Sequence, residues 1–226
     1  LPPLQAGVGS VSNAVLEGLA KSDFEHMTVY SEVLQNSIFD LIDAGKVDFA
    51  SGTSLTISAD RRDDFFRHFD KYRDKIILRP QEISNHPEVI RRLGVIAINT
   101  VIEADIYGNT NSSYIDGSRL MNGVGGSGDY CQNAGLSIFI TKSTARNGAL
   151  SCIVPQVSHV DHTIHEIHAL ITEQGVADLR GLDPVDRAKC IIENCAHPDF
   201  RPALREYLEN AIKSCEHHGN PVDLKA

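Results

Sequence analysis

Thr28-Val29-Tyr30-Ser31-Glu32 joins an apolar run to a carboxylate, and the fold can be worked out from this stretch. Residues 27–30 form a short, mainly apolar run, as in a buried strand, and Glu32 lies just beyond the carboxyl end of this run. Open α/β sheets bind their ligands outside the carboxyl ends of their strands. Glu32 is therefore the candidate reacting group, and a solvated turn or a first-turn helix acid is the structural alternative.

Apolar runs and helix-like stretches alternate on both sides of Glu32. We expect strands at residues 4–6, 47–50, 76–78 and 95–98, and helices at residues 11–19, 37–43, 59–72 and 87–94. Residues 102–115 alternate in polarity and turn at Gly108, which predicts an antiparallel meander. The order predicts an α/β fold with three α/β/α layers and a mainly parallel, partly mixed sheet.

Composition limits the partners. The chain has 226 residues, of which 42% are hydrophobic, and a formal net charge of −9. A pI near 5.5 without a run of Lys or Arg predicts neither nucleic acid nor a membrane as partner. Five cysteines without a C-x-x-C pair suit the reducing cytoplasm. Because Leu1 is not an initiator methionine, we expect the chain to be part of something longer.

The first glycine-rich turn contains Gly7, Val8 and Gly9 between an expected strand and an expected helix. Glycines let a ligand approach the backbone, and the amides of Val8 and Gly9 would point outward near a helix N-terminus. A tight connection is the structural alternative. NAD is not expected, because Ser12 stands where the dinucleotide fingerprint requires a third glycine.

A second glycine-rich run precedes a helix expected to begin near Asp129. Its glycines are Gly123, Gly125, Gly126 and Gly128. Successive outward amides could hold a phosphate or the oxygen of a carbonyl under attack. A flexible loop is the structural alternative.

Three further polar features have two interpretations each. Asn85 could cap the helix that follows it, or hold a carboxylate or thioester oxygen. Glu103 and Asp105 share one face of the expected meander, where we expect them to be exposed. Four histidines recur every third residue over 159–168, but in a strand running from Ile164 into residues 169–171 they would not converge, so no metal site is expected.

The motifs together resemble the C-terminal half of class I CoA-transferases of the acetyl-CoA hydrolase/transferase type, which include succinyl-CoA:acetate and 4-hydroxybutyrate CoA-transferases. The resemblance covers essentially residues 1–226 and implies one C-terminal domain. The motifs that carry it are Leu-Gln-Ala-Gly-Val-Gly at 4–9, Tyr-Ser-Glu at 30–32, Asn-Gly-Val-Gly-Gly-Ser-Gly-Asp-Tyr at 122–130, Ile-Thr-Glu-Gln-Gly-Val-Ala at 171–177 and Ala-His-Pro-Asp-Phe at 196–200.

The resemblance implies a role for each candidate residue. Glu32 would be the nucleophile, the amides of Val8 and Gly126 the oxyanion hole, and Asn85 and Glu173 further active-site groups. The glycine turns would bind coenzyme A, which is a substrate, and no other cofactor is implied. The glycines concerned are Gly7, Gly9, Gly123, Gly125, Gly126 and Gly128.

The implied activity moves CoA between an acyl-CoA and a small carboxylate through an acyl-glutamyl anhydride and a glutamyl-CoA thioester. Acyl-CoA hydrolysis is the alternative if water reaches these intermediates. A non-catalytic CoA-binding module is the second alternative, since the glycine turns alone would suffice to bind CoA. The resemblance also implies an N-terminal domain in the same protein, and we expect a homo-oligomer and low activity of the isolated chain.

Overall fold

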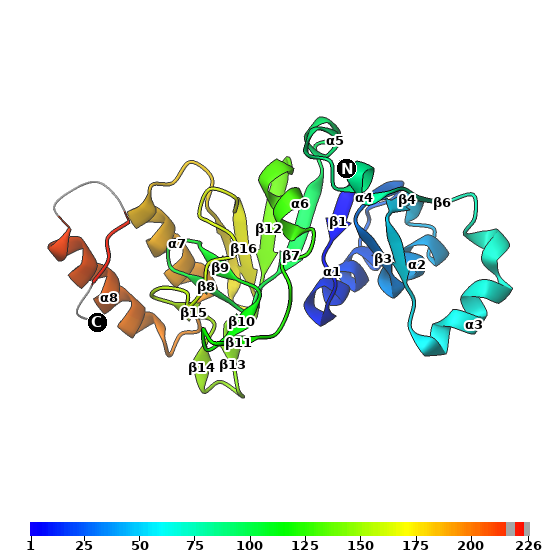
Figure 1. Ribbon diagram of the computed structural model, residues 1–226. Helices are drawn as coiled ribbons and strands as arrows, with labels where there is room; N and C mark the ends of the chain where they lie inside the picture. The colour runs from blue at the N-terminus through cyan, green and yellow to red at the C-terminus, as the bar shows by residue number, and fades with distance from the viewer. Residues whose placement is uncertain (216–219, 224–226) are drawn as a thin grey trace. The chain divides into compact units, whose positions relative to one another are not determined.

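The computed structural model describes residues 1–215 and 220–223, and the chain forms two compact units (Figure 1). Unit 1 comprises Leu1–Thr100 and Gly126–Ser137, and unit 2 comprises Val101–Gly125 and Ile138–Ala226. None of the helices in the described part of the chain combines the length and apolar character needed to cross a membrane.

Unit 1 contains a parallel sheet in the strand order β7-β1-β2-β4-β6. Its strands are β1 (Leu4–Ala6), β2 (Met27–Tyr30), β3 (Val33–Gln35), β4 (Val47–Gly52), β5 (Ser54–Thr56), β6 (Ile76–Leu78) and β7 (Ile96–Thr100). Its helices are α1 (Ser10–Ala20), α2 (Asn36–Asp43), α3 (Ala59–Arg67), the 3-10 helix η1 (Phe69–Lys71), α4 (Gln81–Ser84), α5 (Pro87–Leu93) and α6 (Ser127–Asn133). The short pair β3–β5 is also parallel.

Successive residues of this sheet point into two separate cores. Val29 packs with α1, α2 and α3 residues such as Phe39, whereas Tyr30 packs with Ile90 of α5 and Tyr130 of α6. This alternation is what a strand buried on both faces requires. The predicted α/β class is confirmed, and unit 1 has helices on both faces of its sheet.

Local signals placed most of the helix ends correctly. Gly45 and Gly94 follow α2 and α5 with φ of 72° and 64°, the left-handed conformation that glycine adopts readily. Pro87 occupies the first turn of α5. The prediction of one helix over 59–72 was wrong at its end, because His68 (φ −110°, ψ 26°) leaves the helical region between α3 and η1.

Unit 2 combines parallel and antiparallel pairs. Its strands are β8 (Glu103–Asp105), β9 (Thr110–Asn111), β10 (Tyr114–Ile115), β11 (Arg119–Leu120), β12 (Leu136–Ile140, whose first two residues belong to unit 1), β13 (Thr144–Ala145), β14 (Leu150–Ser151), β15 (Ile153–Val154), β16 (Ala169–Thr172) and β17 (Gly175–Asp178). Its helices are α7 (Pro184–Cys195) and α8 (Arg201–Ser214). β12 and β16 are parallel, β17 pairs antiparallel with β16, and β8 lies between β15 and β9.

The meander around β8 confirms the antiparallel pairing but not the expected exposure. Asp105 is 3% exposed, and its Oδ1 accepts hydrogen bonds from the amides of Tyr107, Gly108 and Asn109. The prediction of an exposed Asp105 was therefore wrong, because the following turn folds back over this carboxylate and needs it as an acceptor.

Candidate active site

The candidate nucleophile follows the carboxyl end of a central strand. Glu32 lies two residues after β2 and is half-buried. Its backbone carbonyl accepts hydrogen bonds from the amides of Thr53 and Ser54, at 2.7 and 3.2 Å, directly after the neighbouring strand β4. The main chain of Glu32 is therefore held on the sheet edge where α/β folds bind ligands.

Asn85 contacts the carboxylate of Glu32 with its side chain. Asn85 Nδ2 donates to Glu32 Oε2 at 3.3 Å and to Asp129 Oδ2 at 3.0 Å. Asn85 does not cap α5, because His86 takes that position and its Nδ1 accepts from the amide of Glu88. Of the two interpretations of Asn85, the geometry matches the carboxamide that holds a carboxylate.

Two buried tyrosines fix the backbone that carries Asn85. The Tyr30 hydroxyl donates to the carbonyl of Ile83 at 2.6 Å, and the Tyr130 hydroxyl donates to the carbonyl of Ser84 at 2.7 Å. Burial raises the pKa of both tyrosines, so both hydroxyl groups keep the proton that they donate. Because Tyr30 is two residues before Glu32, one strand positions both Glu32 and the segment that carries Asn85.

Gly126 lies directly against the Glu32 carboxylate. A Cβ atom added at Gly126 would be 1.9 Å from Glu32 Oε2 and 2.7 Å from Asn85 Nδ2. The φ of −78° is open to any residue, so the close approach, not the backbone conformation, requires glycine here. Gly128, in the first turn of α6, has open space around it.

The first glycine-rich turn lies on the same sheet edge as Glu32. β1 and β2 are parallel neighbours, and Val8 follows β1 as Glu32 follows β2. The Gly7 amide donates to the carbonyl of Ile98, and the Gly7 carbonyl accepts from Gln35 Nε2 at 3.0 Å. Gly9, with φ 144°, precedes α1, and the Val8 side chain is 57% exposed.

Glu173 belongs to unit 2, where it lies in the tight turn between β16 and β17. Its carboxylate accepts hydrogen bonds from the Ser143 hydroxyl and from the Ser143 amide, the latter at 2.9 Å. Burial alone would raise the pKa of Glu173, but these hydrogen bonds outweigh it and lower the pKa to about 2. Gly123 and Gly125 also belong to unit 2, and Gly125 has φ 57°.

Glu173→Gln should destabilise the full-length protein in a pH-dependent way. Since the folded-state pKa lies below the ordinary value near 4.5, the stabilising effect is complete above pH 4.5 and is lost as the pH falls towards 2. The residue is exposed, so we expect the variant to have a Tm about 1–3 °C lower at pH 6, with the difference shrinking as the pH falls from 4.5 towards 2. A Tm difference that does not change with pH would contradict this assignment.

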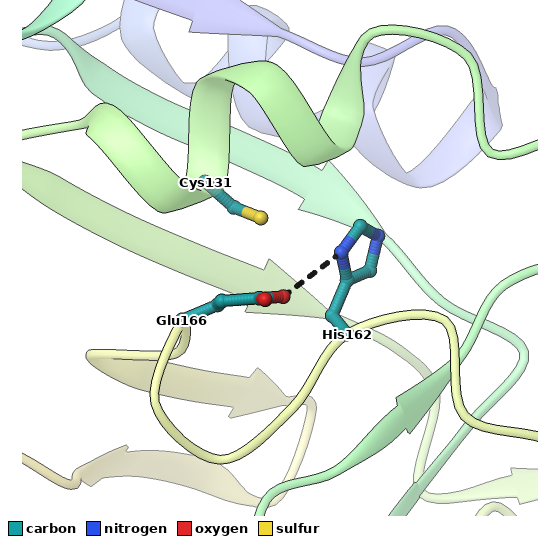
Figure 2. Close-up of side chains that lie close together, drawn as sticks. All are labelled: Cys131, His162 and Glu166. Carbon is teal, nitrogen blue, oxygen red and sulfur yellow. Dashed lines mark ion pairs between the residues drawn. The ribbon is translucent and has the colours of Figure 1, made fainter. Parts of the chain in front are cut away.

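The histidine-rich tract of unit 2 contains one buried member. His162 is 1% exposed, and its Nδ1 lies 3.4 Å from Glu166 Oε2 (Figure 2). Burial lowers the pKa of His162, against the opposing effect of Glu166. The strand expected from Ile164 begins only at Ala169, so residues 159–168 lie before the strand and not in it.

The structure brings together Glu32, Asn85 and Gly126 of the residues singled out from the sequence. It adds Asp129, which sequence reasoning used only as a helix start. The available signal was its place directly after the densest glycine run, where the expected helix begins. Val8 shares the sheet edge, and Glu173 has its own partners in unit 2.

Comparison with known proteins gives a consistent result. Residues 62–208 match the model of a family described as acetyl-CoA hydrolase/transferase C-terminal domain. A succinyl-CoA:acetate CoA-transferase of Clostridium kluyveri is 56% identical over 95% of this chain and 40% of its own length. An acetyl-CoA hydrolase of Candida albicans is 50% identical over 94% of this chain and 41% of its own length.

A solved structure supports the same relationship. The 4-hydroxybutyrate CoA-transferase of Porphyromonas gingivalis aligns with a TM-score of 0.74 and 26% identity, over 92% of this chain and 51% of that chain. The chain thus spans less than half of the length of the two curated relatives.

Proposed function

This chain belongs to the acetyl-CoA hydrolase/transferase C-terminal domain family, and on that basis we propose that it carries the nucleophile of a CoA-transferase. The full-length protein would move CoA between an acyl-CoA and a small carboxylate. In this proposal residues 1–226 act as the C-terminal domain, and an N-terminal domain of the same protein completes the site.

One observation carries the proposal: the Glu32 carboxylate lies against the Gly126 backbone and accepts a hydrogen bond from Asn85. A carboxylate in this position can attack a thioester carbonyl without a general base. The hydrogen bond holds Oε2, so the other carboxylate oxygen is the one expected to attack. Among the nearest neighbours of the glycines in the described part of unit 1, a carboxylate oxygen occurs only at Gly126.

The first chemical step forms an anhydride. The Glu32 carboxylate oxygen bonds to the thioester carbonyl carbon, the C–S bond breaks, and CoA leaves as a thiolate. A thiol pKa of about 8.5 makes this leaving group tolerable, so the site must mainly stabilise the tetrahedral oxyanion. We assign this role to the amides of Val8 and Gly126, since loss of one such donor typically costs ~2.7–4 kcal/mol.

The second step transfers CoA to the enzyme. The thiolate bonds to the glutamyl carbonyl carbon of the anhydride, the glutamyl C–O bond breaks, and the first carboxylate leaves. The Asn85 amide can then donate to the oxygen of the glutamyl thioester. An acceptor carboxylate reverses both steps and leaves as a new acyl-CoA, so the chemistry needs coenzyme A only as a substrate.

The remaining candidates have supporting parts in this proposal. The proposal gives Glu173 the part of a further active-site carboxylate, and its lowered pKa keeps it ionised even in mildly acidic solution. The glycine turns around Gly7 and Gly9, and around Gly123, Gly125 and Gly128, would let CoA approach the backbone. A homo-oligomer in the cytoplasm is part of the same proposal.

Acyl-CoA hydrolysis is the second candidate function. It is favoured by the 50% identity to a relative named acetyl-CoA hydrolase. Water would replace the acceptor carboxylate in its attack on the anhydride or thioester, and the same Glu32 would be required. The two functions differ in how well the closed site excludes water.

An acyl-CoA and carboxylate panel with the full-length protein separates these possibilities. Transfer predicts a new acyl-CoA that appears only when an acceptor is added, while hydrolysis predicts free CoA at the same rate with or without acceptor. If the protein binds CoA but forms neither product, the non-catalytic CoA-binding module is the remaining function and the proposal is overturned. The isolated chain is expected to turn over little, because one domain cannot enclose the reaction.

A further inference from the structure

The Asn85 amide has its orientation imposed by two carboxylates. Its Nδ2 lies 3.3 Å from Glu32 Oε2 and 3.0 Å from Asp129 Oδ2. An ionised carboxylate only accepts hydrogen bonds, so the nitrogen of the amide, not its oxygen, must face both groups. Each of the two N–H bonds is then assigned to one carboxylate.

The oxygen of the Asn85 side-chain amide has no hydrogen bond that would fix the orientation of the amide among the described residues. Asn85 is 7% exposed, and its Oδ1 is buried without a donor among the described residues. A buried carbonyl without a partner costs about 1–3 kcal/mol. The present orientation therefore persists because turning the amide would place Oδ1 against two negative oxygens, which is worse.

Backbone movement is not an easy alternative for this side chain. The hydroxyls of Tyr30 and Tyr130 hold the carbonyls of the two preceding residues, Ile83 and Ser84. The backbone N–H of Asn85 also donates to the backbone carbonyl of Gln81 at 2.8 Å. With the main chain fixed, rotation of the terminal amide is the remaining freedom, and the two carboxylates control it.

We propose that Asp129 is a positioning residue that keeps the Asn85 nitrogen directed at the Glu32 side chain. This inference rests on the proposed function. When Glu32 becomes an anhydride or thioester, it loses its negative charge and no longer distinguishes the two orientations of the amide strongly. Asp129 is then the one anion in contact with Asn85 among the described residues, and it holds the donor in place for the glutamyl carbonyl.

Asp129→Asn is the direct test in the full-length protein. An asparagine can donate or accept, so it no longer dictates which way the Asn85 amide faces. We expect covalent CoA adduct formation from an acyl-CoA without acceptor to slow about 10–100-fold, because misplacement of a catalytic group has effects of this size. The KM for acyl-CoA should change less than about twofold, since substrate binding is not affected.

Coupling to Asn85 separates positioning from a general structural role. Asn85→Ala alone should slow the adduct at least as much, and the double variant should be no slower than Asn85→Ala, because the effect of Asp129 passes through Asn85. Asp60→Asn is the matched control, since Asp60 is the first-turn acid of α3 in the same unit and is exposed. It should leave the rate unchanged.

The possible results have distinct meanings. Adduct formation at the same rate in the wild type and in Asp129→Asn overturns the inference and leaves the proposed function intact. Effects of the two substitutions that multiply independently assign Asp129 a structural role and also overturn the inference. The same holds if Asp129→Asn shows no cooperative transition in a thermal unfolding experiment. A wild type that never forms the adduct overturns the proposed function itself and, with it, the inference.

Discussion

Glu32→Gln in the full-length protein is expected to lower acyl-CoA turnover by at least about 10⁴-fold, as loss of a covalent nucleophile does in other enzymes. Glutamine keeps the size of the side chain and can still contact Asn85, but its amide does not attack a thioester. Incubation with acyl-CoA and no acceptor should leave a covalent CoA adduct on the peptide carrying Glu32 in the wild type. Borohydride should trap that thioester as an alcohol.

The control for this experiment follows from the structure. Glu103 is a poor choice, because its carboxylate accepts hydrogen bonds from Asn111 and Ser158 and its loss would disturb unit 2. Glu82, in the first turn of α4, is exposed and lies in the same unit as Glu32. Glu82→Gln should retain both adduct and turnover. An adduct that persists in Glu32→Gln would mean that another carboxylate is the nucleophile.

Gly126→Ala is expected to lower kcat about 10²–10³-fold with a smaller change in KM. The new methyl group would lie 1.9 Å from Glu32 Oε2 and 2.7 Å from Asn85 Nδ2, so the carboxylate must move away from its position. A displaced nucleophile and a displaced backbone amide both reduce stabilisation of the transition state. Steady-state kinetics of the full-length variant measure the split between kcat and KM.

Gly128→Ala is the matched comparison for Gly126→Ala: its proposed part is only in CoA binding, so any loss should appear in KM and not in kcat. Both positions belong to the same glycine-rich run, but a Cβ at Gly128 meets no atom within 4 Å. Gly128 is inside α6, where alanine is a better helix former than glycine, so stability should be unchanged or slightly higher. Equal losses of activity in the two variants would show that the loop as a whole, not the contact with Glu32, sets the rate.

The strand before Glu32 and the helices expected at 37–43 and 87–94 were predicted to within one residue of their observed bounds. The strand before Glu32, the left-handed glycines after α2 and α5, and the proline in the first turn of α5 depend on a few consecutive residues. The burial of Asp105 could not be predicted from the local pattern, because it depends on a turn that folds back over this residue. Period-two alternation predicts which residues share a face, but not which face another segment covers.

That Glu32 follows a buried strand can be derived from the sequence, because strand ends and residue chemistry are local properties. Its pairing with Asn85, and the pairing of Asn85 with Asp129, join residues 53 and 44 positions apart in the chain. These contacts form only in the folded chain, since they depend on how α4 and α6 pack against β2 through Tyr30 and Tyr130. Packing of distant elements sets side-chain distances to within an ångström, and no pattern along the chain specifies distance at that scale.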